Sequence, residues 1–251
     1  MELVTVTSEN VEREHLCCAL SDKKATAAKR EWLKRNMEHG YVFRKLAGQG
    51  KAFMETVPAE HAWAPVDAGG YLFIDCFWVS GKLAGQGYAS RLFDACVKDA
   101  KELGKHGLVA VSAQKKMPFL SDPGFYRKKG FRLADTAPPY YELLYLPFEE
   151  GAAKPKFLEC ARTGVTDKQG IVLYYSGHCP WNAKYIPFLE KAANERGARF
   201  TTVKLQSAGE ARQVPNPFPT YAMFCDGKFV TNEMFSDKKF IKFLEEKGGG
   251  A

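Results

Sequence analysis

The spacing of apolar residues predicts a regular alternation of strands and amphipathic helices along the first 148 residues. Apolar positions at helical spacing predict helices over 7–16, 25–38, 88–103 and 125–129. Runs of apolar and β-branched residues predict strands over 41–46, 51–57, 71–79, 108–111 and 141–146, and at Phe131. The first two runs flank Gly48-Gln49-Gly50 and therefore predict a hairpin.

The pattern stops at Gly151-Ala152-Ala153-Lys154-Pro155 and then starts again. Beyond this stretch the chain predicts strands over 171–175, 200–205 and 220–224, a hairpin turn at Asp226-Gly227, and helices over 180–196 and 236–247. The order is β-α-β followed by β-β-α. We therefore predict an α/β (α+β) protein with a first domain over 1–148, a linker over 149–165 and a smaller α/β domain over 166–251.

Composition narrows the class of protein. Of the 251 residues, 45% are hydrophobic and 13% aromatic, which is enough to build the cores of two domains. The net charge is +7, and the basic residues are spread along the chain without a long basic run. We therefore expect mild attraction to anionic ligands, and we consider nucleic acid a less favoured ligand. No signal peptide, membrane-spanning run or disulfide framework is predicted, and a reducing cytoplasm fits the seven cysteines best.

The hexapeptide Lys-Leu-Ala-Gly-Gln-Gly occurs twice, at 45–50 and at 82–87. The first copy joins two predicted strands and should form a hairpin turn. The second copy joins a buried strand to a helix, where unpaired backbone N–H groups and the helix dipole attract anions. Its glycines would let a diphosphate approach the backbone closely. A Walker loop is excluded because no Gly-Lys-Ser/Thr follows, and the third glycine of a dinucleotide-binding loop is missing.

The order of motifs around this loop resembles the GNAT superfamily of acetyltransferases. Phe77-Trp78-Val79 precedes the loop, and Tyr126-Arg127-Lys128-Lys129-Gly130-Phe131 matches the Tyr-x-x-x-Gly-Phe motif further along. Within the loop, Gly85, Gly87 and Ala89 stand at the positions of the family pattern. Ala84 departs from it, because the family has Arg or Gln there, and Lys82 is a possible replacement.

The resemblance implies a mixed sheet flanked by helices and acetyl-CoA as the cofactor. The residues it assigns to coenzyme A are Phe77, Val79, Ala84, Gly85, Gln86, Gly87, Tyr88, Ala89 and Ser90. It further implies that Phe77 and Val79 contact the pantetheine arm through their backbones, that the Val79 N–H stabilises an oxyanion, and that Tyr126 is the general acid. A purely structural role in packing is the alternative for Tyr126.

The general base is less well defined. Glu55, Asp75 and His61 lie near strands that could border an acceptor cleft, and a chain of water molecules is the alternative. Strict alternation along the strand places Asp75 on the face opposite Cys76.

Ser176-Gly177-His178-Cys179-Pro180 lies between a predicted strand and helix, and Phe218-Pro219-Thr220 precedes a later strand. This order resembles a thioredoxin-like fold, and the whole chain resembles bacterial GNAT proteins with a C-terminal YoaP-like domain. Asn182 stands where such folds have a second cysteine, so dithiol exchange within the motif is excluded. Cys179 and a cis Pro219 facing it remain a possible thiol site; a binding or structural role without a reactive cysteine is the alternative.

No metal site is predicted. Cys17 and Cys18, which follow His15, diverge by about 100° if they lie on a helix, so they cannot easily hold one ion. The leading hypothesis is an acetyl-CoA-dependent N-acetyltransferase that acts on a small-molecule or peptide amine, with the C-terminal domain aiding recognition of the acceptor or a partner. The alternatives are a non-catalytic coenzyme A- or thiol-binding protein and a redox enzyme. The acceptor, the oligomeric state and the role of Cys17 and Cys18 are not predicted.

Overall fold

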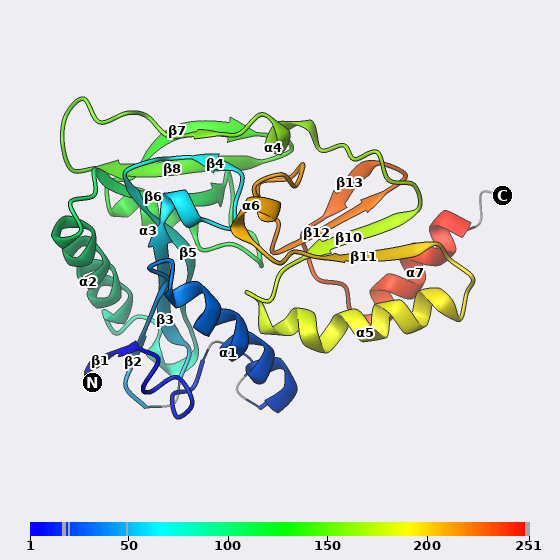
Figure 1. Ribbon diagram of the computed structural model, residues 1–251, viewed down its shortest axis with the longest axis horizontal. Coiled ribbons are helices and arrows are strands. Elements are labelled where there is room, and N and C mark those ends of the chain that lie inside the picture. The colour runs from blue at the N-terminus through cyan, green and yellow to red at the C-terminus, as the bar shows by residue number, and fades with distance from the viewer. Residues whose placement is uncertain (17–18, 20, 49, 249–251) are drawn as a thin grey trace.

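The computed structural model describes residues 1–16, 19, 21–48 and 50–248, which form two large β-sheets with helices packed on them (Figure 1). The larger sheet has seven strands in the order β1-β2-β3-β5-β6-β8-β7. Their bounds are β1 Leu3–Val6, β2 Val42–Leu46, β3 Ala52–Pro58, β5 Tyr71–Val79, β6 Gly107–Ala113, β7 Arg132–Ala137 and β8 Tyr141–Pro147. The predicted hairpin is confirmed, because β2 and β3 pair in antiparallel fashion.

Helices cover both faces of this sheet. Helix α1 (Lys23–Met37) buries Trp32 and Leu33 in a cluster with Phe53 and Phe73, on one face of the strands. Helix α2 (Tyr88–Glu102) and the short α3 (Pro123–Lys128) pack on the opposite face. Alternation along the strands supplies apolar side chains to both faces, so the predicted mixed sheet flanked by helices is confirmed.

The predicted helix over 7–16 is wrong. β1 ends at Val6, and the segment forms a series of turns, in which the Val11 N–H donates to the Thr7 carbonyl. The Asn10 side chain accepts from the Thr7 N–H at 2.8 Å and donates to the Thr5 carbonyl at 3.0 Å. An asparagine side chain that bonds to nearby backbone groups in this way favours turns over a continuous helix. Val11 is still buried, as its apolar character predicts.

Two neighbouring strands of the sheet separate halfway along their length. β5 and β6 run parallel and pair from Tyr71↔Gly107 to Ile74↔Ala110. Beyond Ile74, β5 pairs with β3 and β6 pairs with β8, and no further β5–β6 pair occurs among the described residues. The end of β5 therefore has one edge whose backbone groups face a gap.

The smaller sheet has four strands in the order β11-β10-β12-β13. Their bounds are β10 Ile171–Tyr175, β11 Phe200–Lys204, β12 Tyr221–Cys225 and β13 Lys228–Thr231. Helices α5 (Pro180–Asn194) and α7 (Asp237–Gly248) pack together on one face, below the sheet in Figure 1, and α6 (Ala208–Ala211) follows β11. The predicted β-α-β, β-β-α order is present, while the thioredoxin-like resemblance stays a prediction.

The segment expected to be a linker packs against the larger sheet. Its strand β9 (Lys156–Phe157) pairs with β4 (Val66–Asp67), and a short helix α4 (Cys160–Thr163) follows. Asp135 accepts a hydrogen bond from the Phe157 N–H at 2.8 Å and forms an ion pair with Arg162. The domain boundaries themselves stay a prediction.

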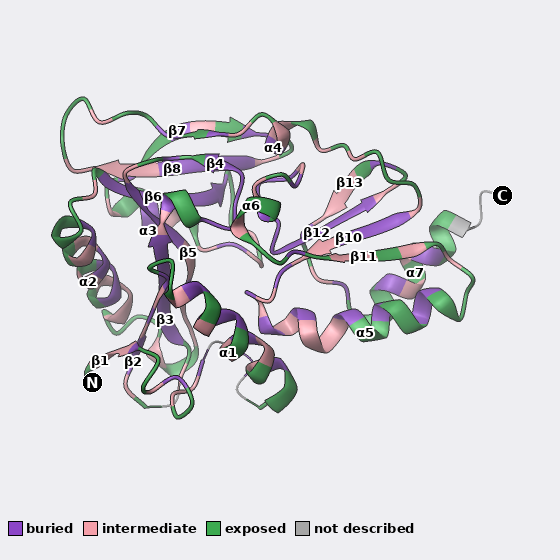
Figure 2. Ribbon diagram, viewed as in Figure 1, coloured by how far each residue is buried: buried purple, intermediate pink, exposed green. Residues whose placement is uncertain are grey.

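The two sheets share one buried interior. A single apolar cluster extends from Phe43 and Phe73 of the larger sheet to Ala222 and Phe224 of β12, and Figure 2 shows buried stretches in the central strands of both sheets. Gly177 lies against Trp32, and a Cβ at this glycine would approach the indole to 2.9 Å. The absence of a side chain thus lets the β10–α5 loop sit directly on α1.

Candidate active site

A cavity of about 510 Å³ lies where the two sheets meet. The larger sheet lines it with residues of β3 and β5, and α3 and the segment before it add Tyr126 and residues 118–121. The C-terminal region lines the other side with residues 178–181, 218, 220–221 and 232–234. Neither half of the chain encloses this space alone.

A buried carboxylate, Glu55, forms the centre of a polar cluster at the cavity wall. The Lys29 ammonium lies 2.5 Å from Glu55 Oε2, and both side chains are almost fully buried. The Tyr41 hydroxyl lies 2.7 Å from the same oxygen and 2.9 Å from Asp75 Oδ2. Burial alone would raise the pKa of Glu55, but the positive charge of Lys29 and the contact with His178 lower it to about 2.

The phenol of Tyr41 stays protonated in this setting. Burial is the main cause that raises its pKa well above the ordinary value, and the charges of Asp75 and Glu55 add to it. Its single proton lies between two carboxylates, so the hydroxyl can donate to only one of them at a time. Tyr41 thus keeps Glu55 and Asp75 together without adding charge.

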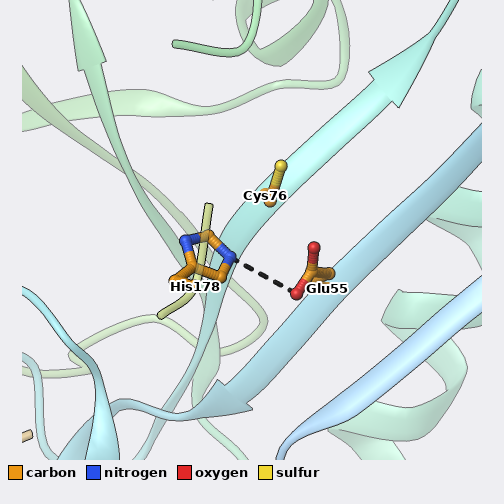
Figure 3. Close-up of side chains that lie close together, drawn as sticks. All are labelled: Glu55, Cys76 and His178. Atoms are coloured by element: carbon orange, nitrogen blue, oxygen red, sulfur yellow. Dashed lines mark ion pairs between the residues drawn. The ribbon is translucent and has the colours of Figure 1, made fainter. Parts of the chain in front are cut away.

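His178 reaches this cluster from the C-terminal region. Its Nε2 lies 3.3 Å from Glu55 Oε2 and 3.7 Å from Asp75 Oδ2 (Figure 3 draws the first contact). The ring packs on Trp32 with the centroids 5.0 Å apart, and Nδ1 lies 3.5 Å from the Thr220 hydroxyl. Within the part of the chain that the structure describes, Nε2 is buried and makes no aligned hydrogen bond.

The sheet geometry places Asp75 and Cys76 on the same side of β5, so the prediction of opposite faces is wrong. Thr56 pairs with Ile74 and Glu55 pairs with Cys76, which leaves Asp75 as the extra residue of a β-bulge. After the bulge the alternation is reversed: Phe77 packs toward α2, and Cys76 and Trp78 pack toward α1. Bulges re-aim side chains in this way. Both Asp75 and Cys76 consequently line the cavity.

The backbone of Phe77 and Val79 faces the gap beside β5. The Ser80 N–H donates to the Lys51 carbonyl at 2.9 Å, so in this antiparallel ladder alternate residues point toward β3 and the residues between them point away. The Ser121 hydroxyl donates to the Phe77 carbonyl at 3.1 Å, from the side away from β3. This arrangement agrees with the geometry expected for Phe77 and Val79, whose roles stay predictions.

The second glycine loop is open to solvent. After the 3₁₀ turn Gly81–Leu83, Gly85 and Gly87 adopt φ values of +76° and +78°, and a Cβ at either would meet no atom within 4 Å. Gln86 does not cover the loop, because its amide donates to the Lys82 carbonyl at 2.6 Å.

The backbone N–H groups of residues 85–90 donate to no acceptor in the described part of the chain. Gly87 precedes Tyr88, the first residue of α2, so these donors point out of a helix N-terminus. The loop residues Ala84, Gly85, Gln86, Gly87, Tyr88, Ala89 and Ser90 therefore fit a diphosphate through their backbone, with no side-chain cation from Ala84.

Tyr126, on α3, lines the cavity and is about 1% exposed. Burial raises the pKa of its phenol well above the ordinary value, and a hydrogen bond with Ser121 opposes this only in part. The side chain packs on Phe131 with ring centroids 5.0 Å apart, so it also has the packing role that the sequence allows. A neutral phenol at this wall is suited to donate a proton.

Two of the three candidate bases are brought together and the third is not. Glu55 and Asp75 line the cavity. His61 is exposed, stacks on His39 with centroids 5.0 Å apart and lies outside the cavity. Among the candidates, His61 alone is excluded by position.

Cys179 lines the cavity at the N-cap of α5, whereas Pro219 is not one of the described residues that line it. The Phe218–Pro219 peptide bond is trans, so the predicted cis proline is wrong. Asn216 Oδ1 accepts from the Phe218 N–H and Asn232 donates to the Phe218 carbonyl, each at 2.9 Å, which holds the residue before the proline. Pro219 borders a separate small cavity.

Asn182 stands where a thioredoxin-like motif would have a second cysteine, and it links the loop before α5 to the segment before β12 by hydrogen bonds. Its amide donates to the Ser176 carbonyl at 3.0 Å and to the Thr220 carbonyl at 2.7 Å. It therefore holds the His178 loop against the start of β12. Cys17 and Cys18 lie outside the described residues, and His15 contacts the Gly50 carbonyl at 2.8 Å.

Sequence reasoning missed His178, Lys29 and Tyr41. His178 was visible only as part of the motif around Cys179, because nothing in the pattern indicates which residue of another domain it meets. Lys29 has a weak signal: it stands beside Trp32 and Leu33 on the apolar side of a predicted helix, where a lysine needs a partner. For Tyr41, the only sequence feature is its place at the start of a predicted strand, and this does not indicate a role in the site.

Comparisons with known proteins agree with this architecture. Residues 9–131 match the acetyltransferase (GNAT) family and residues 200–242 match the YoaP-like family. The protein described as uncharacterized N-acetyltransferase YoaP of Bacillus subtilis (strain 168) is 38% identical over 244 residues, which cover 96% of this chain and 97% of that protein. The chain therefore belongs to the GNAT acetyltransferase family of transferases, whose acetyl donor is acetyl-CoA, and it carries a YoaP-like C-terminal region.

Several solved structures are similar to part of the chain. Ard1 of Thermoplasma volcanium is 15% identical with a TM-score of 0.42, over 59% of this chain and 98% of that one. The aminoglycoside 6′-N-acetyltransferase of Enterococcus faecium is 12% identical with a TM-score of 0.43, over 60% and 100%. YhbS of Escherichia coli, a GNAT protein in complex with CoA, is 17% identical with a TM-score of 0.39, over 63% and 89%. No described helix has the length and hydrophobicity needed to cross a membrane.

Proposed function

We propose that this chain transfers an acetyl group from acetyl-CoA to a primary amine bound in the cavity between the two sheets. The observation that carries the proposal is the gap beside β5. Its open backbone edge leads from the exposed glycine loop, through Ser80, to a cavity that contains buried carboxylates.

The donor side is supplied by backbone groups. The free N–H groups of residues 85–90 would hold the diphosphate of coenzyme A, and the backbone of Phe77 and Val79 would pair with the pantetheine arm. The Val79 N–H is our candidate oxyanion donor. When bound, acetyl-CoA supplies a thioester carbonyl that an amine can attack directly.

The acceptor side carries an excess of negative charge. Lys29 neutralises Glu55, whereas Asp75 has no cationic side chain beside it among the described residues unless His178 is protonated. An alkylammonium group would be attracted to this place, and the aromatic side chains of Trp78, Phe119 and Trp181 line the same cavity. We therefore propose a cationic amine with an apolar body as the acceptor.

Proton transfer would use two groups on opposite sides of the reacting atoms. The amine must lose a proton before or during attack, and Asp75, positioned by Tyr41, is our candidate to accept it. Tyr126, held neutral by burial, would donate its proton to the departing thiolate. The net reaction R–NH₃⁺ + CH₃CO–S–CoA → R–NH–CO–CH₃ + CoA–SH + H⁺ removes two protons from nitrogen. Asp75 would accept one and release it to solvent, and the other would restore the phenol of Tyr126 after Tyr126 has protonated the thiolate.

The C-terminal region would define the acceptor end. His178, Trp181 and Phe218 line the cavity opposite β5, so the region recognises the acceptor directly. This role follows from its position and requires no chemistry at Cys179.

The two copies of the hexapeptide offer a matched test of donor binding. Gly48 and Gly85 occupy the same position in each copy, have φ values of +82° and +76°, and have no atom within 4 Å of a Cβ. Gly48→Glu and Gly85→Glu thus introduce the same charge and similar backbone strain. Calorimetry should show acetyl-CoA binding to wild type and Gly48→Glu, and at least about 10-fold weaker binding to Gly85→Glu.

Equal binding to all three proteins would contradict the proposed loop. Acetyl-CoA binding without thiol release in the presence of any of a panel of amines would instead favour the non-catalytic alternative, in which the chain only binds coenzyme A or thiols.

A further inference from the structure

We propose that Glu55, Cys76 and His178 form a binding site for a zinc-class divalent metal ion. One ligand atom from each side chain lies within 4.8 Å of the other two. Figure 3 shows the three side chains close together, with the His178–Glu55 contact dashed; they belong to β3, β5 and the loop before α5. The inference concerns metal binding itself and does not depend on the proposed transfer reaction.

The donor set suits an ion of this class. A thiolate, an imidazole nitrogen and a carboxylate oxygen are the three kinds of side-chain ligand that tetrahedral zinc takes. His178 Nε2 lies 3.3 Å from Oε2 of Glu55, so the imidazole is already next to the carboxylate whose other oxygen, Oε1, would be the ligand. The ligand atoms lie within 4.8 Å of one another and would have to draw somewhat closer around an ion whose bonds are about 2.0–2.3 Å long.

His178 has the orientation of a ligand. Its side chain is 5% exposed, and Nε2 is a buried polar atom without an aligned hydrogen bond among the described residues. Leaving such an atom unsatisfied is costly, and a metal ion would satisfy it. The Thr220 hydroxyl faces Nδ1, which is the contact that orients metal-bound histidines through their other ring nitrogen.

The charges around the cluster also favour a cation. Lys29 neutralises Glu55, and Asp75 contributes one further negative charge within 3.7 Å of the imidazole. Binding would follow Cys–SH + M²⁺ → Cys–S–M⁺ + H⁺, so that the ion and the Cys76 thiolate together add one positive charge. This charge balances Asp75.

Lys29 and the ion need not compete for the same oxygen. Lys29 and Tyr41 both contact Oε2 of Glu55, and no hydrogen bond in the described part of the chain uses Oε1. The second oxygen is therefore available to a metal ion. The fourth coordination position would open into the cavity, where water or another ligand can enter.

The test is titration of metal-free protein, prepared without a histidine tag, with Co²⁺ alone and then with Zn²⁺. We expect one equivalent of Co²⁺ to produce a sulfur-to-cobalt charge-transfer band, which one equivalent of Zn²⁺ abolishes. Cys76→Ser should lose the band. His178→Gln should weaken binding by more than the about 10- to 100-fold that loss of an outer-shell contact causes.

Cys225→Ser and His61→Gln are the matched controls, because both residues lie outside the cavity, and both variants should bind as wild type does. Near-UV circular dichroism checks that each variant is folded, and Zn²⁺ should raise the unfolding temperature of wild type but not of His178→Gln. The proposal is overturned if wild type shows no charge-transfer band, or if the band survives in Cys76→Ser and disappears in Cys179→Ser.

Discussion

Nε2 of His178 lies 3.3 Å from Oε2 of Glu55, although one residue belongs to the YoaP-like region and the other to the GNAT sheet. The contact places the two parts of the chain around one cavity. It also explains why the β10–α5 loop needs Gly177 to approach Trp32 so closely. A C-terminal region in this position lines the candidate active site together with the larger sheet.

The buried ion pair between Lys29 and Glu55 should be essential for stability. Replacing Lys29 with Met leaves a buried carboxylate without its cation, and breaking such a pair costs about 3–5 kcal/mol. Denaturant unfolding of Lys29→Met should show a loss of this size. The double variant Lys29→Met/Glu55→Gln removes both charges and should recover most of it; a double variant as unstable as the single one would contradict the pair's role.

Tyr126→Phe should lower kcat with little effect on the affinity for acetyl-CoA. A general acid contributes about 10²- to 10⁴-fold, and the ring itself remains to pack on Phe131. Since burial raises the pKa of Tyr126, its acid form persists as pH rises, and wild type should show no alkaline decline in rate from this group up to its ordinary pKa of about 10. Steady-state kinetics of both proteins across pH test this. An unchanged kcat in Tyr126→Phe would leave the tyrosine with packing alone.

The ion pair of Asp135 with Arg162 should stabilise the protein at neutral pH and cease to do so in acid. The partly buried carboxylate would have a raised pKa from burial alone, but the Phe157 N–H and Arg162 lower it below the ordinary value. A depressed pKa means that the stabilisation is complete above the unfolded value of about 3.9 and is lost as pH falls through the folded one.

Asp135→Asn should therefore reduce stability by about 1 kcal/mol at pH 7. Thermal unfolding of both proteins between pH 7 and pH 3 should show this difference shrinking toward the acid end. A difference that stays constant with pH would mean that the carboxylate charge is irrelevant.

Much of the fold followed from local sequence patterns, because each pattern reports the burial of one element. The run from Tyr71 to Val79 and the helix over 88–103 were predicted for this reason. The helix over 7–16 was not correct, because Asn10 supplies side-chain bonds that favour turns.

The site was predictable only where it depends on the backbone. The second glycine loop has the open geometry that its place between strand and helix implies. The cavity was not predictable, since it depends on a bulge at Asp75 and on the contact of His178 with Glu55. Neither a bulge nor a contact between distant segments leaves a periodic signal in one sequence.

Asp75→Asn should reduce the rate of acetyl transfer by roughly 10²-fold or more, because the amide cannot accept the proton of the amine. Acetyl-CoA binding should be unchanged, since Asp75 lies on the acceptor side. Asp67→Asn, an exposed carboxylate on β4, is the control and should retain full activity. Loss of acetyl-CoA binding in Asp75→Asn would show that the residue acts structurally.

The most direct measurement is acetyl transfer to a metabolite extract, with isotopically labelled acetyl-CoA and mass spectrometric detection. Wild type and Gly48→Glu should add the labelled acetyl group to the same amine, and Gly85→Glu and Asp75→Asn should not. An extract without any labelled amine in the presence of wild type, or with equal product from Gly85→Glu, would contradict the assignment of the glycine loop and the cavity to acetyl transfer.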